Sequence, residues 1–186
     1  MRIIGGDYAR LRLTPPKGLK LRPTTDLAKE ALFSALGSLI PLEGKRVLDL
    51  FSGTGSIGIE FVSRRAEEVV FVEKNPKHAR YIQSIIKELR PSSTTQVVVQ
   101  DTFKYIAKCE KTFDLIFADP PYDLPTINDL PNLVLGSSLL SPEGYFVLEH
   151  PSSLQFIDTH PACFKHKSYS EVNFSFFRNV SSLLKR

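Results

Sequence analysis

Short apolar runs alternate with amphipathic stretches along most of the chain. The runs at 47–50, 69–72, 97–99, 115–117 and 144–149 predict buried strands. Helices are predicted between them, from a glycine-rich turn at 52–58 to about residue 64, from Asn75 and Pro76 onward, and around 128–140. Strands that alternate with helices predict an α/β fold, with helices on both faces of a mostly parallel sheet. Two more strands, near 164–169 and 174–177, predict a hairpin and hence one antiparallel edge strand.

The first 40 residues follow a different pattern. Residues 2–13 predict a small hairpin around a Gly-Gly-Asp turn. Period two puts Leu11 and Leu13 on one of its faces. Arg10 and Arg12 then share the other face, which makes one side of the hairpin cationic.

A helix is predicted to follow this hairpin. Thr25 or Asp26 can cap its start, apolar residues recur at helical spacing, and Gly37 or Pro41 can end it. The composition changes at about residue 22. We therefore expect a basic N-terminal hairpin arm at 1–22 and a main domain at 23–186.

The charge of the chain is concentrated in that arm. The 186 residues carry 24 Lys+Arg and 20 Asp+Glu, for a net charge of +4, and 42% of them are hydrophobic. The basic residues of the arm are Arg2, Arg10, Arg12, Lys17, Lys20 and Arg22, against one acid. The rest of the chain is close to neutral. A basic block on a neutral body predicts a polyanionic partner, although a merely solubilising tail has the same composition.

Metal and membrane chemistry have little support in the sequence. The two cysteines have no metal-ligand or redox spacing and are typical of free thiols in a reducing compartment. The four histidines form no ligand motif, and no apolar run approaches membrane-spanning length. We expect a cytoplasmic protein without a signal peptide, a membrane contact or a metal.

Glycines and acids in the first half of the repeats predict a nucleotide-like cofactor. Gly53, Gly55 and Gly58 follow a predicted strand and open a helix, with Glu73 twenty residues after the first of them. Glu73 can accept hydrogen bonds from two ribose hydroxyls. A structural glycine turn with a surface glutamate is the simpler alternative.

The neighbouring acids help to identify the cofactor. NAD and S-adenosylmethionine both fit the glycines, but Asp49, just before the turn, can hold the ammonium group of S-adenosylmethionine and favours it. Asp101 and Thr102 follow the third strand, where Asp101 can accept from an adenine amine.

The sequence Asp119-Pro120-Pro121-Tyr122 follows the fourth predicted strand. Two prolines end the strand and stiffen the turn. The Asp119 carboxylate and a prolyl carbonyl can each accept one N–H, and the Tyr122 ring can stack on a base. This set suits a planar group with an NH₂, such as a nucleobase amine, although a plain Pro-Pro turn would look the same.

Taken together, these residues resemble a class I methyltransferase, and more narrowly the RsmD family, which methylates N2 of a guanine in 16S ribosomal RNA. The resemblance covers nearly the whole chain. It rests on the opening Arg-Ile-Ile-Gly-Gly, on Leu-Arg-Pro-Thr at 21–24 with Glu-Ala-Leu-Phe at 30–33, on the glycine motif, on Val-Glu-Lys-Asn at 72–75 and on the Asp-Pro-Pro-Tyr turn. The glycine motif and the turn are common to many amino-methyltransferases, whereas the N-terminal marks are specific to this family.

The resemblance implies a Rossmann-like fold with a seven-stranded sheet and an N-terminal β-hairpin. It implies that Asp49, Gly53, Gly55, Glu73 and Asp101 bind S-adenosylmethionine and that Asp119, Pro120 and Tyr122 bind the target amine. The implied partner is 16S ribosomal RNA, either naked or within the assembling small ribosomal subunit, and we expect a monomer. From the charge, we expect Arg10, Arg12 and Arg22 to contact the RNA.

Three other functions compete with this one. A protein-glutamine methyltransferase usually has Asn where this chain has Asp119. A DNA adenine or cytosine methyltransferase generally needs an added recognition region, whereas an adenine-N6 methyltransferase acting on RNA shares the pocket chemistry. A non-catalytic RNA-binding module would explain the basic arm but not the donor-site pattern.

Overall fold

The computed structural model describes residues 1–15, 25–169 and 171–179. Seven strands form one sheet in the order β3-β2-β1-β4-β5-β7-β6. The strands are β1 (Arg46–Leu50), β2 (Glu68–Glu73), β3 (Thr94–Val99), β4 (Phe113–Ala118), β5 (Leu140–His150), β6 (Cys163–Tyr169) and β7 (Val172–Arg178). The first five run parallel to one another. The expected seven-stranded, Rossmann-like α/β fold is therefore confirmed.

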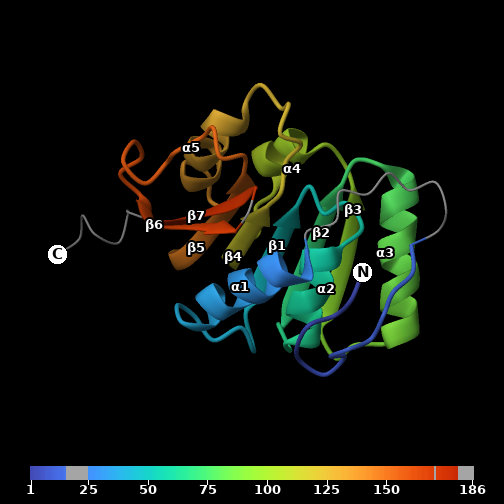
Figure 1. The fold of residues 1–186 in the computed structure, drawn as a ribbon. Helices are drawn as coiled ribbons and strands as arrows, with labels where there is room; N and C mark the ends of the chain where they lie inside the picture. Colours follow the sequence, from blue (N-terminus) through green and yellow to red (C-terminus); the bar gives the residue numbers. More distant parts are fainter. Residues whose placement is uncertain (16–24, 170, 180–186) are drawn as a thin grey trace.

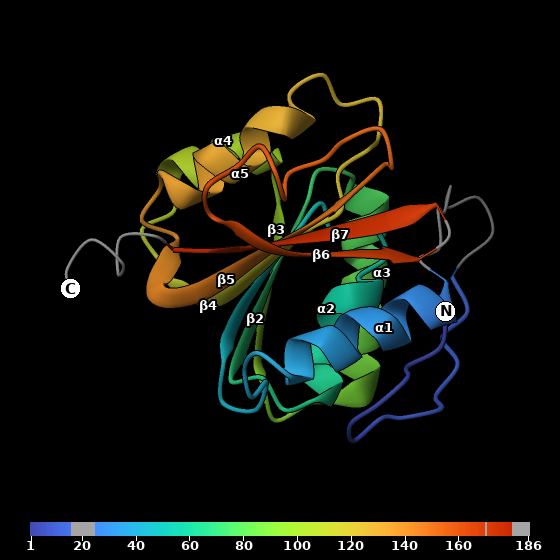
Figure 2. The same cartoon turned by 60° about the vertical axis from the view of Figure 1, so that its left-hand side comes forward.

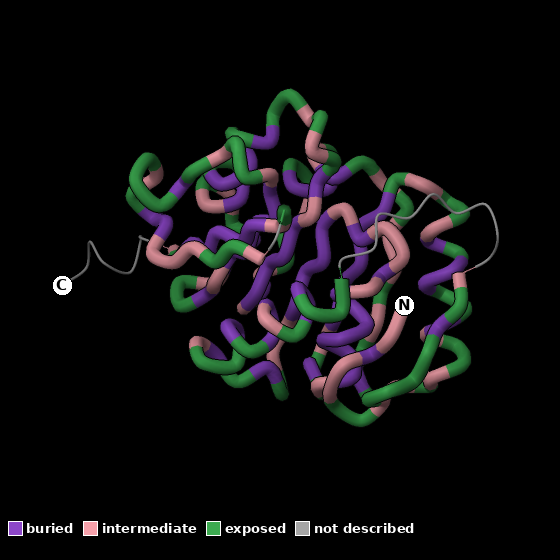
Figure 3. Tube along the Cα trace, viewed as in Figure 1, coloured by how far each residue is buried: buried purple, intermediate pink, exposed green. Residues whose placement is uncertain are grey.

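Helices cover both faces of the sheet (Figures 1 and 2). One layer contains α1 (Asp26–Gly37), α2 (Ser56–Ser63) and α3 (Pro76–Leu89). The other contains α4 (Thr102–Lys108) and α5 (Leu130–Leu135), which follows the short 3₁₀ helix η1 (Ile127–Asp129). The sheet is buried between these layers, as the purple central strands in Figure 3 show.

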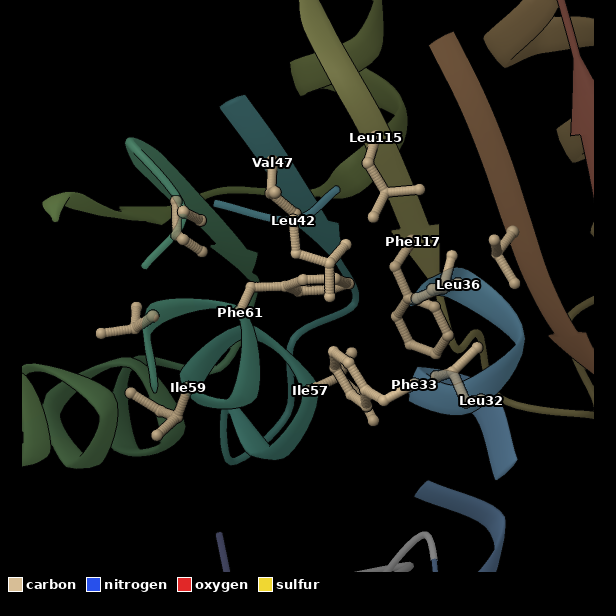
Figure 4. Close-up of a cluster of buried hydrophobic side chains, with 14 of the residues drawn as sticks. Leu32, Phe33, Leu36, Leu42, Val47, Ile57, Ile59, Phe61, Leu115 and Phe117 are labelled. Atoms are coloured by element: carbon tan, nitrogen blue, oxygen red, sulfur yellow. The ribbon is translucent and has the colours of Figure 1, made fainter. Parts of the chain in front are cut away.

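The apolar stripe of α1 packs on the same sheet face as α2. Phe33 of α1 and Phe61 of α2 lie 4.9 Å apart between ring centroids, and Phe117 of β4 lies in the same cluster (Figure 4). Thr25 caps α1, because its hydroxyl accepts from the Ala28 N–H. This packing fixes the start of α1 next to the carboxyl end of the sheet.

Two of the predicted elements differ from the structure, and the structure has one helix that the sequence analysis did not predict. The helix predicted over 128–140 is shorter, because α5 ends at Leu135 before Gly136 and the chain enters β5 at Leu140. Helix α4 was not predicted. The antiparallel strand is β7, which lies between β5 and β6, so the edge strand β6 is not the antiparallel one.

The N-terminal hairpin is less regular than predicted. Only one antiparallel bridge, Arg2 with Arg12, is present in the described part of the arm, although the Ile3 N–H also donates to the Leu11 carbonyl at 3.0 Å. Arg10 has a φ of 71°, which interrupts the extended backbone. Leu13 is accordingly buried (6% exposed), whereas Leu11 is 38% exposed, so the two leucines do not share a buried face as predicted.

Candidate active site

The carboxyl ends of β1 and β4 form the topological switch point of the sheet, where the strand order reverses. Ligands bind at this point in open α/β sheets. β1 and β4 are parallel neighbours, with Asp49 paired with Phe117. Asp49 and Asp119 therefore lie near each other at one edge of the sheet.

A cavity of about 620 Å³ opens at this edge. Its floor is formed by the β1 and β4 ends and the loop after β1, namely Asp49, Phe51, Ser52, Gly53, Thr54, Ser56, Ile57, Phe117 and Asp119. The facing wall comes from the N-terminal segment and the start of α1, including Arg2, Arg12, Asp26 and Lys29. The volume is in the range of small-molecule sites.

The three glycines after β1 are required for two different structural reasons. Gly53 and Gly55 have φ values of 55° and 76°, in the left-handed region that favours glycine. Gly58 is required for close packing, since a Cβ there would lie 2.7 Å from Asp49 Oδ2 and 2.1 Å from the Phe71 ring. The loop can therefore expose its backbone to the cavity while α2 packs tightly on the sheet.

Asp49 is a buried carboxylate at the centre of the site. Its Oδ2 accepts from the Gly58 N–H at 3.0 Å. Burial raises the pKa of Asp49 well above its ordinary value, and the nearby charges of Asp119 and Glu73 raise it further, despite that hydrogen bond. A cationic group bound beside Asp49 would offset this cost.

Glu73, at the end of β2, is more than a candidate ribose acceptor. Its Oε2 accepts from the Gly53 N–H at 2.8 Å and its Oε1 from the Asn75 N–H at 2.7 Å. It is buried behind the glycine loop rather than in the cavity lining described above. The structure thus gives Glu73 a second role that the sequence spacing did not indicate, which is to hold the loop.

Asp101 and Thr102 lie farther along the same edge, after β3. The Asp101 side chain caps α4 by accepting from the Lys104 N–H at 3.2 Å, and Thr102 is the buried first residue of that helix. Neither residue is in the lining of the cavity. The structure brings them to the carboxyl edge of the sheet, at the start of α4.

The Asp-Pro-Pro-Tyr turn follows β4, and of its four residues Asp119 alone is in the cavity lining. Asp119 is half-buried, and Pro120 is buried. Tyr122 is partly buried, and its hydroxyl donates to Oε1 of Glu149 at 3.5 Å. Asp119 and Asp49 lie in the same cavity lining, close enough for the Asp119 charge to act on Asp49.

The N-terminal arm is fixed to α1 and α2 by a buried ion pair. Lys29 and Glu60 are 1% and 0% exposed, and Lys29 Nζ lies 3.2 Å from Glu60 Oε1. Glu60 accepts from the backbone N–H groups of Ile4 and Gly5, while Lys29 donates to the Arg2 carbonyl. The described arm is therefore held against the body at the mouth of the cavity.

The three predicted RNA-contacting arginines are placed differently. Arg12 is exposed and lines the cavity. Arg10 is exposed but outside the cavity lining, and Arg22 lies outside the described residues. Arg2, which the sequence did not single out, joins Arg12 at the cavity mouth.

Comparison with known proteins identifies the family. A family model described as Conserved hypothetical protein 95 matches residues 1–178. The chain is 35% identical to YlbH of Bacillus subtilis (strain 168) over 162 residues, covering 86% of this chain and 87% of that protein. It is 30% identical to ribosomal RNA small subunit methyltransferase D of Escherichia coli (strain K12) over 151 residues, covering 80% and 74% of the two chains. The chain belongs to this family, the RsmD family.

Solved structures confirm the fold of this RsmD-family chain. A hypothetical protein of Thermus thermophilus superposes with a TM-score of 0.82 at 27% identity, over 96% of this chain and 99% of that one. The 16S rRNA N2 methyltransferase RsmC of the same species, in complex with AdoMet and guanosine, superposes with a TM-score of 0.66 at 24% identity, over 84% of this chain and 44% of that one. At that identity the second likeness shows the class I methyltransferase fold alone.

Sequence reasoning missed Arg2 and Lys29, which line the cavity, and also Glu60 and Glu149, which lie outside its lining and contact Lys29 and Tyr122. No spacing motif marks them, since each is brought to its partners by tertiary packing. Within the described ranges no cluster of three or more side chains suited to a metal ion occurs. Among the same residues, no helix has the length and apolar character needed to cross a bilayer.

Proposed function

We propose that this RsmD-family chain transfers a methyl group from S-adenosylmethionine to the exocyclic N2 of a guanine in 16S ribosomal RNA of the small subunit. One observation carries the proposal, which is that Asp49 and Asp119 line the same cavity. A donor-side acid and a target-side acid at one switch point fit direct transfer between two ligands. Proximity of this kind supplies much of the acceleration in transfer reactions.

The residues present fit S-adenosylmethionine, which carries an ammonium and a sulfonium group. Buried Asp49 suits a cationic group, and the backbone of Gly53 lines the cavity, whereas Gly55 is buried against Ile82. Glu73, Asp101 and Thr102 would complete the donor site toward the ribose and adenine. When bound, S-adenosylmethionine supplies an electrophilic methyl group.

The target-side residues would orient the amine. A nucleobase amine is a poor nucleophile because its lone pair is delocalised into the ring. The Asp119 carboxylate and the Pro120 carbonyl would each accept one N–H and turn the lone pair toward the donor, while Tyr122 stacks on the base. The base has to leave its stack to reach such a pocket, which favours an exposed or flipped nucleotide.

The proposed RNA contact is the arm. Arg12 lies at the cavity mouth, and Arg10 and Arg22 belong to the same basic block, with Arg22 outside the described residues. We propose that these arginines bind phosphates near the target base. The choice of guanine rests on the family, because the acceptor pair would also accept adenine N6.

A methylation assay with product analysis tests this function. The protein is incubated with labelled S-adenosylmethionine and either naked 16S ribosomal RNA or small-subunit assembly particles, and the RNA is digested to nucleosides for mass spectrometry. We expect N2-methylguanosine with the parent. Asp119→Ala should reduce the rate by about two to three orders of magnitude, because the amine loses one of its two acceptors.

The outcomes separate the mechanism from the specificity. N6-methyladenosine would retain the mechanism and overturn the guanine assignment. Full activity of folded Asp119→Ala would overturn the role of the turn. Asp123→Ala is the matched control. Asp123 is exposed and directly follows the Asp-Pro-Pro-Tyr turn, and this variant should be as active as the parent.

A further inference from the structure

Glu149 is a buried acid that the chemistry proposed above does not use. It is the penultimate residue of β5 and is only 1% exposed. Carboxylates are seldom so fully buried unless other groups engage them. Its position at the carboxyl end of a central strand places it at the same edge as the candidate active site.

The strand register places Glu149 beside Asp119. Phe117 pairs with Val147 and Ala118 with Leu148, so Asp119, the first residue after β4, lies beside Glu149, which is still within β5. Glu149 is two residues after Val147, which packs on the α1 and α2 face together with Phe117. Because strand side chains alternate, Glu149 points to the face on which the cavity opens.

The Tyr122 hydroxyl reaches this carboxylate. It donates to Glu149 Oε1 across 3.5 Å, from a turn that has left β4 four residues earlier. The two partners differ in rigidity. Glu149 is held in a strand with neighbours on both sides, β4 and β7, where it pairs with Phe174. Tyr122 belongs to a connection between β4 and η1.

We propose that Glu149 is a positioning residue of the target pocket, which anchors the Tyr122 hydroxyl and thereby sets the plane of the ring on which the target base stacks. This inference rests on the proposed function. A ring fixed at its Cα and at its hydroxyl cannot rotate freely. The base is then presented to Asp119 and Pro120 in one orientation, which matters for an in-line transfer.

The acceptor oxygen, rather than the negative charge, is what this role requires. Glu149→Gln keeps an oxygen that can accept from Tyr122, whereas Glu149→Met keeps the length of the side chain and removes the acceptor. Tyr122→Phe removes the donor and keeps the ring. If the two residues act through one hydrogen bond, the variants cannot be additive.

A double-mutant cycle with a rescue arm tests the proposal. Turnover and KM for the RNA are measured for the parent, Tyr122→Phe, Glu149→Met, the double variant and Glu149→Gln. We expect each of the first two single variants to lower kcat by up to about tenfold, the size expected for one ordinary hydrogen bond. The double variant should be no worse than either single one, and Glu149→Gln should stay near the parent. Glu143→Met, at an exposed position of the same strand, is the matched control and should change nothing.

A second readout does not depend on catalysis. In protein labelled with ¹³C in its tyrosine rings, the Tyr122 signal is assigned by its loss in Tyr122→Phe. We expect it to shift in Glu149→Met and to stay in place in Glu149→Gln. Affinity for S-adenosylmethionine, measured by calorimetry, should be unchanged in all folded variants.

Every result of these experiments supports or overturns the role of Glu149. Additive effects, a Glu149→Gln as slow as Glu149→Met, or an unshifted Tyr122 signal would overturn it. If Glu149→Met fails to fold, Tyr122→Phe decides, since parent-level kcat in that variant overturns the inference. A parent that methylates no ribosomal RNA would refute the proposed function instead, and the ring signal would still test the anchor.

Discussion

At the residue scale, Asp49 shows a conflict between stability and ligand binding. Its pKa is raised by burial, so the folded protein binds that proton more tightly than the unfolded chain does. The carboxylate therefore costs stability at neutral pH. The cost is absent well below pH 4 and grows as the pH rises through the folded pKa.

We predict that Asp49→Asn raises the melting temperature of the ligand-free protein at pH 7. The amide oxygen can still accept from the Gly58 N–H, whereas the buried charge is gone. The same change should weaken binding of S-adenosylmethionine by about 1.5–3 kcal/mol, the value of a hydrogen bond to a charged group. Calorimetry and thermal melts at pH 3.5 and pH 7 measure both effects. A melting temperature that falls at pH 7 would contradict the account.

Glu73 gives a second prediction at this scale. Its two oxygens accept from Gly53 and Asn75, so an amide in its place would set an NH₂ against one of these N–H groups. We expect both Glu73→Ala and Glu73→Gln to weaken binding of S-adenosylmethionine by about 2–4 kcal/mol, the rough sum of two hydrogen bonds from the ribose hydroxyls to this carboxylate less relaxation. Calorimetry tests this, with the exposed Glu67→Gln as control. Parent affinity in folded Glu73→Gln would remove Glu73 from the donor site.

The sequence indicated several candidate site residues because their spacing follows the rules of the fold. Gly53, Gly55 and Glu73 are separated by distances that a strand, a turn and a helix impose, and Asp119 follows an apolar run directly. Glu149 could not be predicted, because a glutamate near a strand end has no motif of its own. Only the β4–β5 register brings it to Tyr122.

At the element scale, the arm and the two helices behind it depend on one buried ion pair. Removing Lys29 leaves the buried Glu60 charge with Arg64 Nε, 3.6 Å away, as its remaining cationic partner, and removing one partner of a buried ion pair costs up to about 3–5 kcal/mol. We predict that Lys29→Met lowers the free energy of unfolding by this amount, because Glu60 is 0% exposed. Urea denaturation measures it, and exposed Lys77→Met on α3 is the control. A loss below about 1 kcal/mol would mean that water or the Ile4 and Gly5 N–H groups already stabilise Glu60.

The elements that the sequence misplaced have short or irregular patterns. Helix α4 has seven residues, too few for a clear apolar stripe, and its cap Asp101 was interpreted only as a ligand contact. The helix expected over 128–140 was extended too far, because Leu139 and Leu140 continue its apolar pattern although they pack with β5. In both cases the local pattern did not determine whether the segment was helical, and tertiary packing determined it.

At the scale of the whole molecule, the uneven charge predicts how RNA binding depends on salt. Arg12 lines the cavity, whereas Arg10 does not. We expect Arg12→Ala to lower RNA affinity and to reduce the salt slope by about 0.7–0.9 if one phosphate contact is lost. Arg10→Ala should have the smaller effect. Filter binding across a salt series tests this. Equal salt slopes of RNA affinity in Arg12→Ala and the parent would mean that the arm does not contact the RNA and acts only as a solubilising segment.

The place of β7 in the sheet also constrains the order in which the molecule can be assembled. Among the described residues β7 is the last strand in sequence order, yet it lies between β5 and β6. Within the described chain, β6 has no other strand partner, so it can join the sheet only with β7. During synthesis, β1 to β3 leave the ribosome before residues 172–178 do. β5, which carries Glu149, therefore has one open edge until β7 has been synthesised and can pair with it.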